Sequence, residues 1–559
     1  MFRSSRSIAT RSSPDPSARL RLAQTGRRLL GSFALLLAFA ALFLGGMVTP
    51  AGAGASVVFT PASAPGASQR SSEPTEARRQ AIAWRACGGR LQCARVLVPL
   101  DWDHPHSRKI KLAVIRHVAS RPGKRIGSLF INPGGPGGSV EKVRHDGASL
   151  DAAGGGRFDV VGWDIRGAGE SAHVRCFRSE KRLARFFDHW SIPTTSPASR
   201  RYLRKSAALA RGCSAVSGTL LRHISTADTA RDLDYLRRLV GDRRLTYLGI
   251  SAGTFIGQTY ANMFPRRVRA MVLDGVVDPV AFTKGNEAGF ANQLAYTNRA
   301  FKGFMSLCEK AGPTRCALAG DGQVAPRVEA LFRRLRRASI GAPSANPPGR
   351  LTYSDALSAI VVDLSAGPAE WPSLADQLDQ AARGDGSELL SRSRILTQAF
   401  SSQRVAPGLA AVALICADSP ARQSPRAWRK VIDRLTGVSF IYGPVLSWWR
   451  WAPCASWPVR SADRYTGPWN ASTKNPILVI GTRFDPNTPY TNARQAARRL
   501  GNAVLLTHQG YSHTSESDPS SCVRRATSRY LIDLVVPSRG SVCPSNHQPF
   551  DPHFGEPLP

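Results

Sequence analysis

One stretch, residues 245–265, constrains the fold more than any other part of the chain: LTYLGISAGTFIGQTYANMFP. An apolar, strand-like run leads into a Gly-x-Ser-x-Gly turn, and a helical pattern follows directly. A serine on such a strand–turn–helix corner indicates a nucleophile elbow, in which glycines let neighbouring chain approach closely. We therefore interpret Ser251 as a nucleophile rather than as a packed turn residue, and we expect the chain to supply its base and acid.

Short apolar strands alternate with helices on both sides of this turn. The strand patterns cover residues 93–99, 110–116, 127–132, 158–164 and 268–274. Residues 226–240 carry leucines at helical spacing behind an acidic start, as a helix dipole prefers. This alternation predicts an α/β fold in which a mostly parallel, doubly wound sheet has helices on both faces.

The alternation stops after residue 279 and resumes near residue 476. Residues 280–470 show a mostly helical pattern with tryptophan and proline clusters. Further strands are predicted at 476–481 and 503–507, and further helices at 489–500 and 522–535. We therefore expect one sheet, built from residues 80–279 and 471–559, which is interrupted by a helical lid of residues 280–470.

The N-terminus has the order of an export signal. Residues 1–28 contain arginines and almost no acid, residues 29–48 are apolar, and two Ala-x-Ala sites follow within residues 51–55. Residues 1–55 are therefore interpreted as a signal peptide, with an uncleaved membrane anchor as the alternative. Residues 56–79 then form a flexible leader. The expected location is outside the cell or in the cell envelope.

The charge balance and the cysteines bear on possible partners and on the compartment. The chain has 75 basic and 39 acidic residues, a formal charge of +36. This excess favours contact with anionic envelope polymers, or with a membrane through the N-terminal segment, but no nucleic-acid-binding motif accompanies it, so nucleic acid is not an expected partner. The ten cysteines form no metal-binding spacing. Pairing each with its neighbour would give five local loops suited to an oxidising compartment; the sequence leaves the pairing open, and we expect at least three disulfides.

The acid that Ser251 requires is expected after a later strand. In this fold class the catalytic residues follow the chain order Ser, Asp or Glu, His. Asp485 lies in the segment GTRFDPNTP, just past the strand at 476–481, where a loop presents side chains at the carboxyl edge of the sheet. Asp274, with Asp278 behind it, is the rival, but its LDGVVDP turn suits a structural role. We predict Asp485 as the acid.

Two histidines compete for the role of base. His508 lies close to the strand at 503–507, whereas His513 lies in a Gly-x-x-His loop beyond it. A loop position lets an imidazole reach the serine from the sheet edge, and we therefore predict His513 as the base.

A glycine-rich loop, NPGGPGGS at residues 132–139, follows another strand. Hydrolases with a nucleophile elbow draw one oxyanion donor from such a loop and one from the residue after the nucleophile. We predict the N–H groups of Gly135 and Ala252 as the donors, with Gly134 as the substitute for Gly135. No lysine or nucleotide motif supports a phosphate-binding loop. The segment DIRGAGES at 164–171 is expected to brace the site through buried hydrogen bonds.

Taken together, these segments resemble the secreted tripeptidyl aminopeptidases, relatives of proline iminopeptidase among the α/β-hydrolase serine peptidases. The resemblance covers residues 80–550 and includes VPLDW, WPSLADQLDQAARGD and VCPSNHQPF. It implies the α/β-hydrolase fold and the removal of short N-terminal peptides, usually tripeptides, through an acyl-enzyme without a cofactor or metal. Two residues depart from the pattern: Ala252 stands where relatives commonly carry tyrosine, and Pro133 stands where proline iminopeptidases have histidine.

An aminopeptidase must also recognise the free ammonium of its substrate, a peptide or protein with a free N-terminus. A carboxylate at a fixed distance from Ser251 would do so, and the candidates in the lid are Glu287, Glu370 and Asp418. Two other functions remain open: an esterase or lipase with the same three catalytic residues, and a non-catalytic envelope protein that uses the fold as a binding scaffold.

Overall fold

The computed structural model describes residues 81–554, apart from residues 136, 189, 286, 321, 399–406, 420–424 and 462. The predicted signal peptide (1–55) and leader (56–79) lie outside the described residues. No helix within the described part of the chain is both long and apolar enough to cross a membrane.

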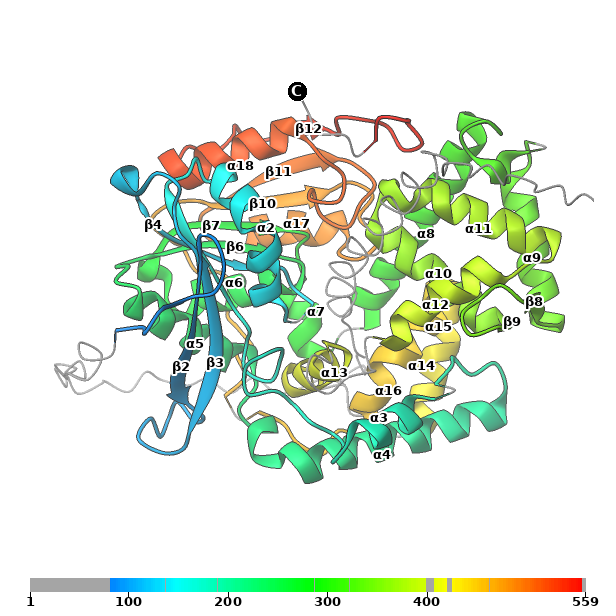
Figure 1. Ribbon diagram of the computed structural model, residues 1–559, viewed down its shortest axis with the longest axis horizontal. Coiled ribbons are helices and arrows are strands. Elements are labelled where there is room, and N and C mark those ends of the chain that lie inside the picture. Colours follow the sequence, from blue (N-terminus) through cyan, green and yellow to red (C-terminus); the bar gives the residue numbers. More distant parts are fainter. Residues whose placement is uncertain are drawn as a thin grey trace, which may run out of the picture.

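A ten-stranded sheet forms the centre of the described chain, in the order β1-β2-β3-β5-β4-β6-β7-β10-β11-β12 (Figure 1). Its parallel part is made of β5 (Phe158–Trp163), β4 (Gly127–Asn132), β6 (Leu245–Ile250), β7 (Val268–Asp274), β10 (Ile477–Thr482), β11 (Ala503–Gln509) and β12 (Val542–Pro544). An antiparallel edge is added by β1 (Arg85–Ala86), β2 (Leu91–Pro99) and β3 (Lys109–His117). The predicted mostly parallel sheet is confirmed, and strands from both ends of the sequence share it.

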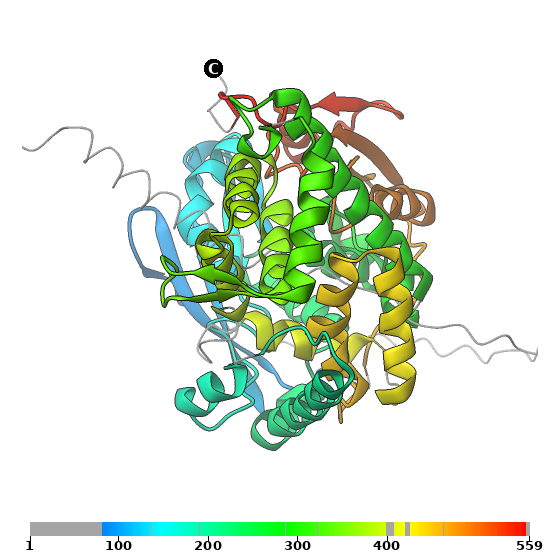
Figure 2. The ribbon, with the colours of Figure 1, turned by 90° about the vertical axis from the view of Figure 1, so that its right-hand side faces the viewer.

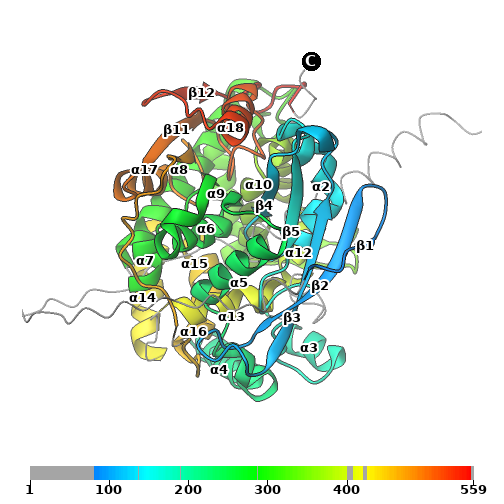
Figure 3. The ribbon, with the colours of Figure 1, turned by 90° about the vertical axis from the view of Figure 1, so that its left-hand side faces the viewer.

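Helices cover both faces of the sheet (Figure 3). On one face, α2 (Ser139–Ala153) and α18 (Ser521–Asp533) bury residues such as Val143 and Leu531 against the strands. On the other face lie α5 (Thr226–Leu239), α6 (Ala252–Met263) and α17 (Tyr490–Arg499). Because both faces are covered, the central strands are mostly apolar, as parallel strands usually are.

The chain between β7 and β10 forms a helical cap. It contains α7 (Pro279–Lys284), α8 (Glu287–Ala311), α9 (Val324–Arg337), α10 (Tyr353–Ala366), α11 (Trp371–Arg383), α12 (Ser387–Gln398), α13 (Pro407–Asp418), α14 (Pro425–Val438), α15 (Tyr442–Leu446) and α16 (Ala452–Ala455), with a small hairpin of β8 (Ile340–Ala342) and β9 (Gly349–Leu351). Figure 2 shows this cap face-on. It packs over the loops that follow β10 and β11: Thr297 Oγ1, for example, donates to the Pro486 carbonyl at 2.6 Å.

A second helical segment, which the sequence analysis did not single out, joins the cap. It consists of α3 (Glu180–Phe187) and α4 (Ser196–Leu221), between β5 and α5. The hydroxyl of Tyr202 on α4 donates to the Trp448 carbonyl at 3.0 Å, and the Ile192 N–H donates to Ser354 Oγ at 2.9 Å. The cap is thus held from two regions that are far apart in the sequence.

Five disulfides link each cysteine to its neighbour in the sequence: Cys87–Cys93, Cys176–Cys213, Cys308–Cys316, Cys416–Cys454 and Cys522–Cys543. The expectation of at least three disulfides is confirmed. Such a set is typical of proteins that mature in an oxidising compartment.

Candidate active site

The turn at Ser251 has the geometry of a nucleophile elbow. Ser251 lies between β6 and α6 with φ 54° and ψ −121°, a strained conformation for a residue with a side chain. Its N–H donates to the Asp274 carbonyl at 2.9 Å, which ties the turn to the end of β7. A Cβ at Gly249 would lie 2.6 Å from the Gly253 carbonyl oxygen, and a Cβ at Gly253 would collide with the Asn132 carbonyl. Glycine is therefore required on both sides of the serine.

The three predicted catalytic side chains meet at the carboxyl edge of the sheet. Ser251 Oγ lies 2.7 Å from His513 Nε2, and His513 Nδ1 lies 3.0 and 3.1 Å from the two carboxylate oxygens of Asp485. All three residues are buried. When Nδ1 donates its hydrogen to the carboxylate, Nε2 is the ring nitrogen that can accept the proton of the serine hydroxyl.

The loop after β10 holds the Asp485 carboxylate in place. Oδ1 accepts hydrogen bonds from the N–H groups of Asn487 at 2.7 Å and Thr488 at 2.8 Å, and Oδ2 accepts from Thr488 Oγ1 at 2.7 Å. Thr488 Oγ1 also lies 3.4 Å from His513 Nδ1. Thr488 is not among the predicted site residues; its position three residues after the acid, just before Pro489, was the available signal.

The rival acids have structural roles. Asp274 Oδ2 accepts hydrogen bonds from Ser515 N at 3.0 Å and Ser515 Oγ at 2.6 Å, and so it anchors the loop that carries His513. Burial raises the pKa of Asp274 to about 6. Asp278 caps α7 through the Val280 N–H at 3.0 Å.

The rival base, His508, is enclosed at the end of β11. Its Nδ1 lies 3.2 Å from Thr482 Oγ1, and its Nε2 lies 3.2 Å from Ser545 Oγ. Burial lowers the pKa of His508 to about 4. It has no contact with Ser251 among the described residues.

The glycine-rich loop lies directly against the elbow. The Gly134 N–H donates to Asn132 Oδ1 at 3.0 Å, so this donor is already used within the loop. A Cβ at Gly134, where φ is 87°, would lie 2.7 Å from the Ile250 carbonyl and 2.9 Å from the Ala252 nitrogen. The missing side chain lets the loop approach the start of α6 closely at Gly134.

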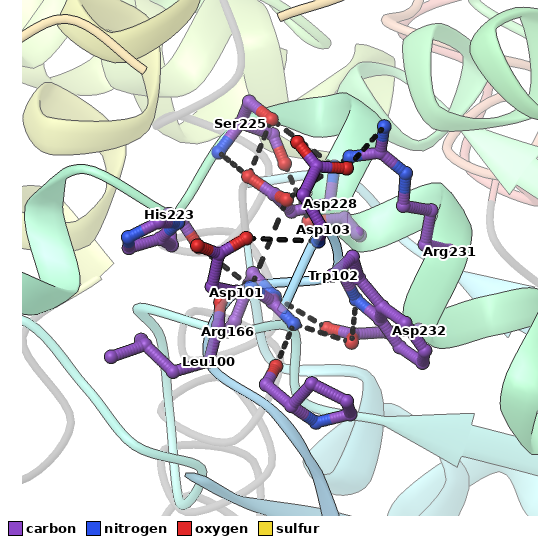
Figure 4. A network of polar contacts seen from close by, with 12 residues as sticks. Leu100, Asp101, Trp102, Asp103, Arg166, His223, Ser225, Asp228, Arg231 and Asp232 are labelled. Atoms are coloured by element: carbon purple, nitrogen blue, oxygen red, sulfur yellow. Dashed lines mark hydrogen bonds and ion pairs between the residues drawn. The ribbon is translucent and has the colours of Figure 1, made fainter. Parts of the chain in front are cut away.

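The segment 164–171 forms buried hydrogen bonds, and Figure 4 shows those around Arg166. Arg166 is fully buried; its guanidinium donates to both carboxylate oxygens of Asp232 at 2.7 Å and to the main-chain carbonyls of Pro99, Leu100 and His223. A buried charge requires such complete pairing. Asp164 accepts hydrogen bonds from the N–H groups of Val140 and Glu170, while burial raises its pKa to about 6.

The three lid acids lie in different surroundings. Glu287 pairs with Arg434 at 2.6 and 2.9 Å, and Glu370 pairs with Arg392 at 3.1 Å, both partly exposed. Asp418 is buried at the end of α13, where Oδ2 accepts hydrogen bonds from Thr226 N at 3.0 Å and Thr226 Oγ1 at 2.6 Å. Burial raises the pKa of Asp418 to about 7. Asp418 also lines a pocket that reaches Ala252.

Two protein-family models match the chain. The model described as "alpha/beta hydrolase fold" matches residues 127–306, from β4 through the elbow into α8. The model described as "TAP-like protein" matches residues 439–543, which include Asp485 and His513. Together, the two matches contain the three residues that meet at the sheet edge.

Relatives match over most of the chain. Serine protease Hip1 of Mycobacterium tuberculosis is 33% identical, over 83% of this chain and 91% of the relative. Carboxylesterase B of the same organism is 34% identical, over 86% and 92%, and tripeptidyl aminopeptidase of Streptomyces lividans is 28% identical, over 85% and 88%. The fold, the elbow and these matches define an α/β-hydrolase of the serine peptidase class. Within that class, the chain belongs to the tripeptidyl aminopeptidase family, which confirms the resemblance seen in its sequence.

Proposed function

We propose that the protein is an exported serine aminopeptidase that releases short N-terminal peptides, in particular tripeptides. The observation that carries this proposal is the continuous chain of contacts from Ser251 Oγ through His513 to Asp485, at 2.7 and 3.0 Å. A serine with a base and an orienting acid at these distances is equipped for acyl transfer.

In the proposed mechanism, His513 takes the hydroxyl proton as Ser251 attacks the peptide carbonyl, and Asp485 stabilises the resulting imidazolium. The N–H groups of Gly135 and Ala252 bind the developing oxyanion, and the N-terminus of α6 favours the same negative charge. His513 then protonates the leaving amine. Water, activated by the same histidine, hydrolyses the acyl-enzyme and releases the peptide.

The cap supports an exopeptidase rather than an enzyme that attacks folded proteins. Ser251 has no exposed surface, and the cap packs over the loops that carry Asp485 and His513. Recognition of the substrate ammonium then falls to a cap carboxylate. Glu287 and Glu370 are partly exposed, and each would exchange an arginine partner for the substrate; Asp418 is buried beside the pocket.

The decisive measurement uses tripeptide p-nitroanilides with free and with acetylated N-termini. An aminopeptidase should release the intact tripeptide, seen by mass spectrometry, and should lose at least tenfold in kcat/KM on acetylation. Equal rates for the two forms would overturn the proposal.

A carboxylesterase is the second candidate, because one relative that matches 86% of the chain is named Carboxylesterase B. The two activities share the serine chemistry and differ in the acyl group. Faster turnover of simple p-nitrophenyl esters than of every free tripeptide substrate would favour the esterase.

We further propose that the protein is secreted or associated with the cell envelope, where its excess of basic over acidic residues favours anionic polymers. The five disulfides support an oxidising compartment. The N-terminal sequence of the mature protein tests this: cleavage after residue 53 or 55 is expected, and an intact N-terminus recovered from membranes would instead indicate an anchor.

A further inference from the structure

A small pocket lies between the core and the cap, beside the residue that follows the nucleophile. It measures about 40 Å³. The core and the first cap residues contribute Ile165, Thr226, Thr229, Ala252, Phe255, Ile256, Val277 and Phe282, and α13 contributes Leu414, Ile415 and Asp418. The walls are thus mainly apolar, while two threonines and one carboxyl group supply the polar part. Ala252 is the link to the reaction, since its backbone is adjacent to Ser251.

The polar part of this pocket has an unused hydrogen-bond acceptor. Both hydrogen bonds to the Asp418 carboxyl, from Thr226 N and Thr226 Oγ1, go to Oδ2. Among the described residues, Oδ1 accepts no hydrogen bond. The polar atoms that are both fully enclosed and without a partner do not include Oδ1, so this oxygen is not fully enclosed. Asp418 is one of the residues that line this pocket, and from these two facts we infer that Oδ1 faces it.

The size of the pocket excludes the substrate's N-terminus as its occupant. A water molecule needs about 10–15 Å³ of such space, so the pocket holds about three non-hydrogen atoms. An extended tripeptide spans about 10 Å, which places its ammonium well beyond a pocket of this size next to Ala252. A side chain of three heavy atoms, such as valine or threonine, fits instead.

We propose that this pocket binds the side chain of the residue whose carbonyl Ser251 attacks, and that Asp418 makes it select a short hydroxyl side chain, threonine or serine, over apolar side chains of equal size. The assignment rests on the proposed peptidase function and specifies its substrate. A hydroxyl at the polar part of the pocket donates to Asp418 Oδ1, whereas a methyl group leaves this acceptor unsatisfied in apolar surroundings. A preference of about tenfold or more is expected above pH 7, where Asp418, whose pKa burial raises to about 7, is an ionised acceptor.

Ala252 determines how much of the pocket is open. Ala252 forms part of the wall, and we expect a large side chain at this position to occupy the space that the substrate needs. The Ala252→Tyr substitution keeps the backbone N–H while it removes the volume, so it tests size separately from the Asp418 acceptor.

The test compares Ala-Ala-Thr, Ala-Ala-Val and Ala-Ala-Leu p-nitroanilides, which differ only in the residue before the cut. Wild-type protein should prefer threonine over valine about tenfold or more in kcat/KM, and leucine should be poorer than valine. In Asp418→Asn, the amide oxygen keeps the hydrogen bonds from Thr226 and the NH₂ group faces the pocket. The substrate hydroxyl can accept from this NH₂ group, but its hydrogen bond to a charged acceptor is lost, so the threonine preference should decrease severalfold.

Ala252→Tyr should lose more than tenfold on threonine and valine substrates and less on Ala-Ala-Gly p-nitroanilide. The labelling rate of Ser251 with a small fluorophosphonate and the melting temperature show whether either variant keeps its fold and its nucleophile.

Two outcomes would overturn the pocket assignment: an unchanged threonine-to-valine ratio in a folded Asp418→Asn variant, or equal wild-type rates on the two substrates. A failure of the proposed function looks different, because wild-type protein would then turn over esters and cleave no peptide. In that case, the pocket assignment is tested with p-nitrophenyl esters of threonine and valine. The same threonine-to-valine ratio of kcat/KM is expected for these esters.

Discussion

The α/β core and the helical cap orient their polar side chains by different means. In the core, backbone groups determine the orientation: Asp485 is held by N–H groups of its own loop, and Ser251 by the turn between β6 and α6. In the cap, Glu287 and Glu370 instead face arginines from other helices, Arg434 on α14 and Arg392 on α12. Local sequence therefore encodes the chemistry of the core, whereas the polar contacts of the cap depend on tertiary packing.

The largest effect should come from the nucleophile. Ser251→Ala removes the attacking hydroxyl without altering the loop, and kcat on tripeptide p-nitroanilides should fall by about 10⁶-fold. Circular dichroism of the variant should match the wild type. Activity within tenfold of the wild type would show that the core does not carry the chemistry.

The Asp485→Asn substitution should have the next largest effect, a loss of about 10⁴-fold in kcat. The amide no longer favours the histidine tautomer that accepts the serine proton. Asp274→Asn is the matched control on the adjacent strand: it touches Ser515 and not His513, so its loss should stay within about tenfold. A larger loss for Asp274→Asn than for Asp485→Asn would reverse the assignment of the acid.

A cap acid should instead affect stability and its pH dependence. Asp363 on α10 is buried, accepts hydrogen bonds from Arg392 Nε and from Gln377 Nε2, and has its pKa raised by burial from 3.8 to about 7. Between pH 4 and 7 the folded protein holds a proton that the unfolded chain has released, so the stabilisation present below pH 4 is lost as the pH rises through 7.

Asp363→Asn removes this proton. Urea denaturation gives the free energy of unfolding of the wild type and of the variant at each pH. The wild-type value minus the variant value should decrease by up to about 4 kcal/mol from pH 4 to pH 7. A difference that does not change with pH would mean that Asp363 stays ionised beside Arg392 in the folded state.

The smallest effect is expected at the cap surface. Glu287→Gln removes a partly exposed ion pair with Arg434, and the unfolding free energy should change by less than about 1 kcal/mol. kcat/KM should stay within twofold. A tenfold rise in KM that is seen with free but not with acetylated substrates would identify Glu287 as the residue that binds the substrate ammonium.

The same contrast explains how far prediction from sequence succeeded. The order of strands and helices and the meeting of Ser251, His513 and Asp485 follow from local patterns, because parallel strands bring their carboxyl ends to one edge. The packing of α4 onto the cap and the arginine partners of Glu287 and Glu370 could not be predicted, since they depend on segments far apart in the chain. Thr488 is an intermediate case. The sequence shows its position three residues after Asp485, but only the structure shows its contact with His513.

The complete burial of Ser251 has a consequence for turnover. A peptide reaches the hydroxyl only after cap and core separate, so each cycle includes an opening step whose frequency sets an upper limit on the rate. The disulfide Cys416–Cys454 ties α13, and with it Asp418, to α16, so these two helices must travel together in that step. Solvent viscosity should then slow the fastest substrates more than the slow ones.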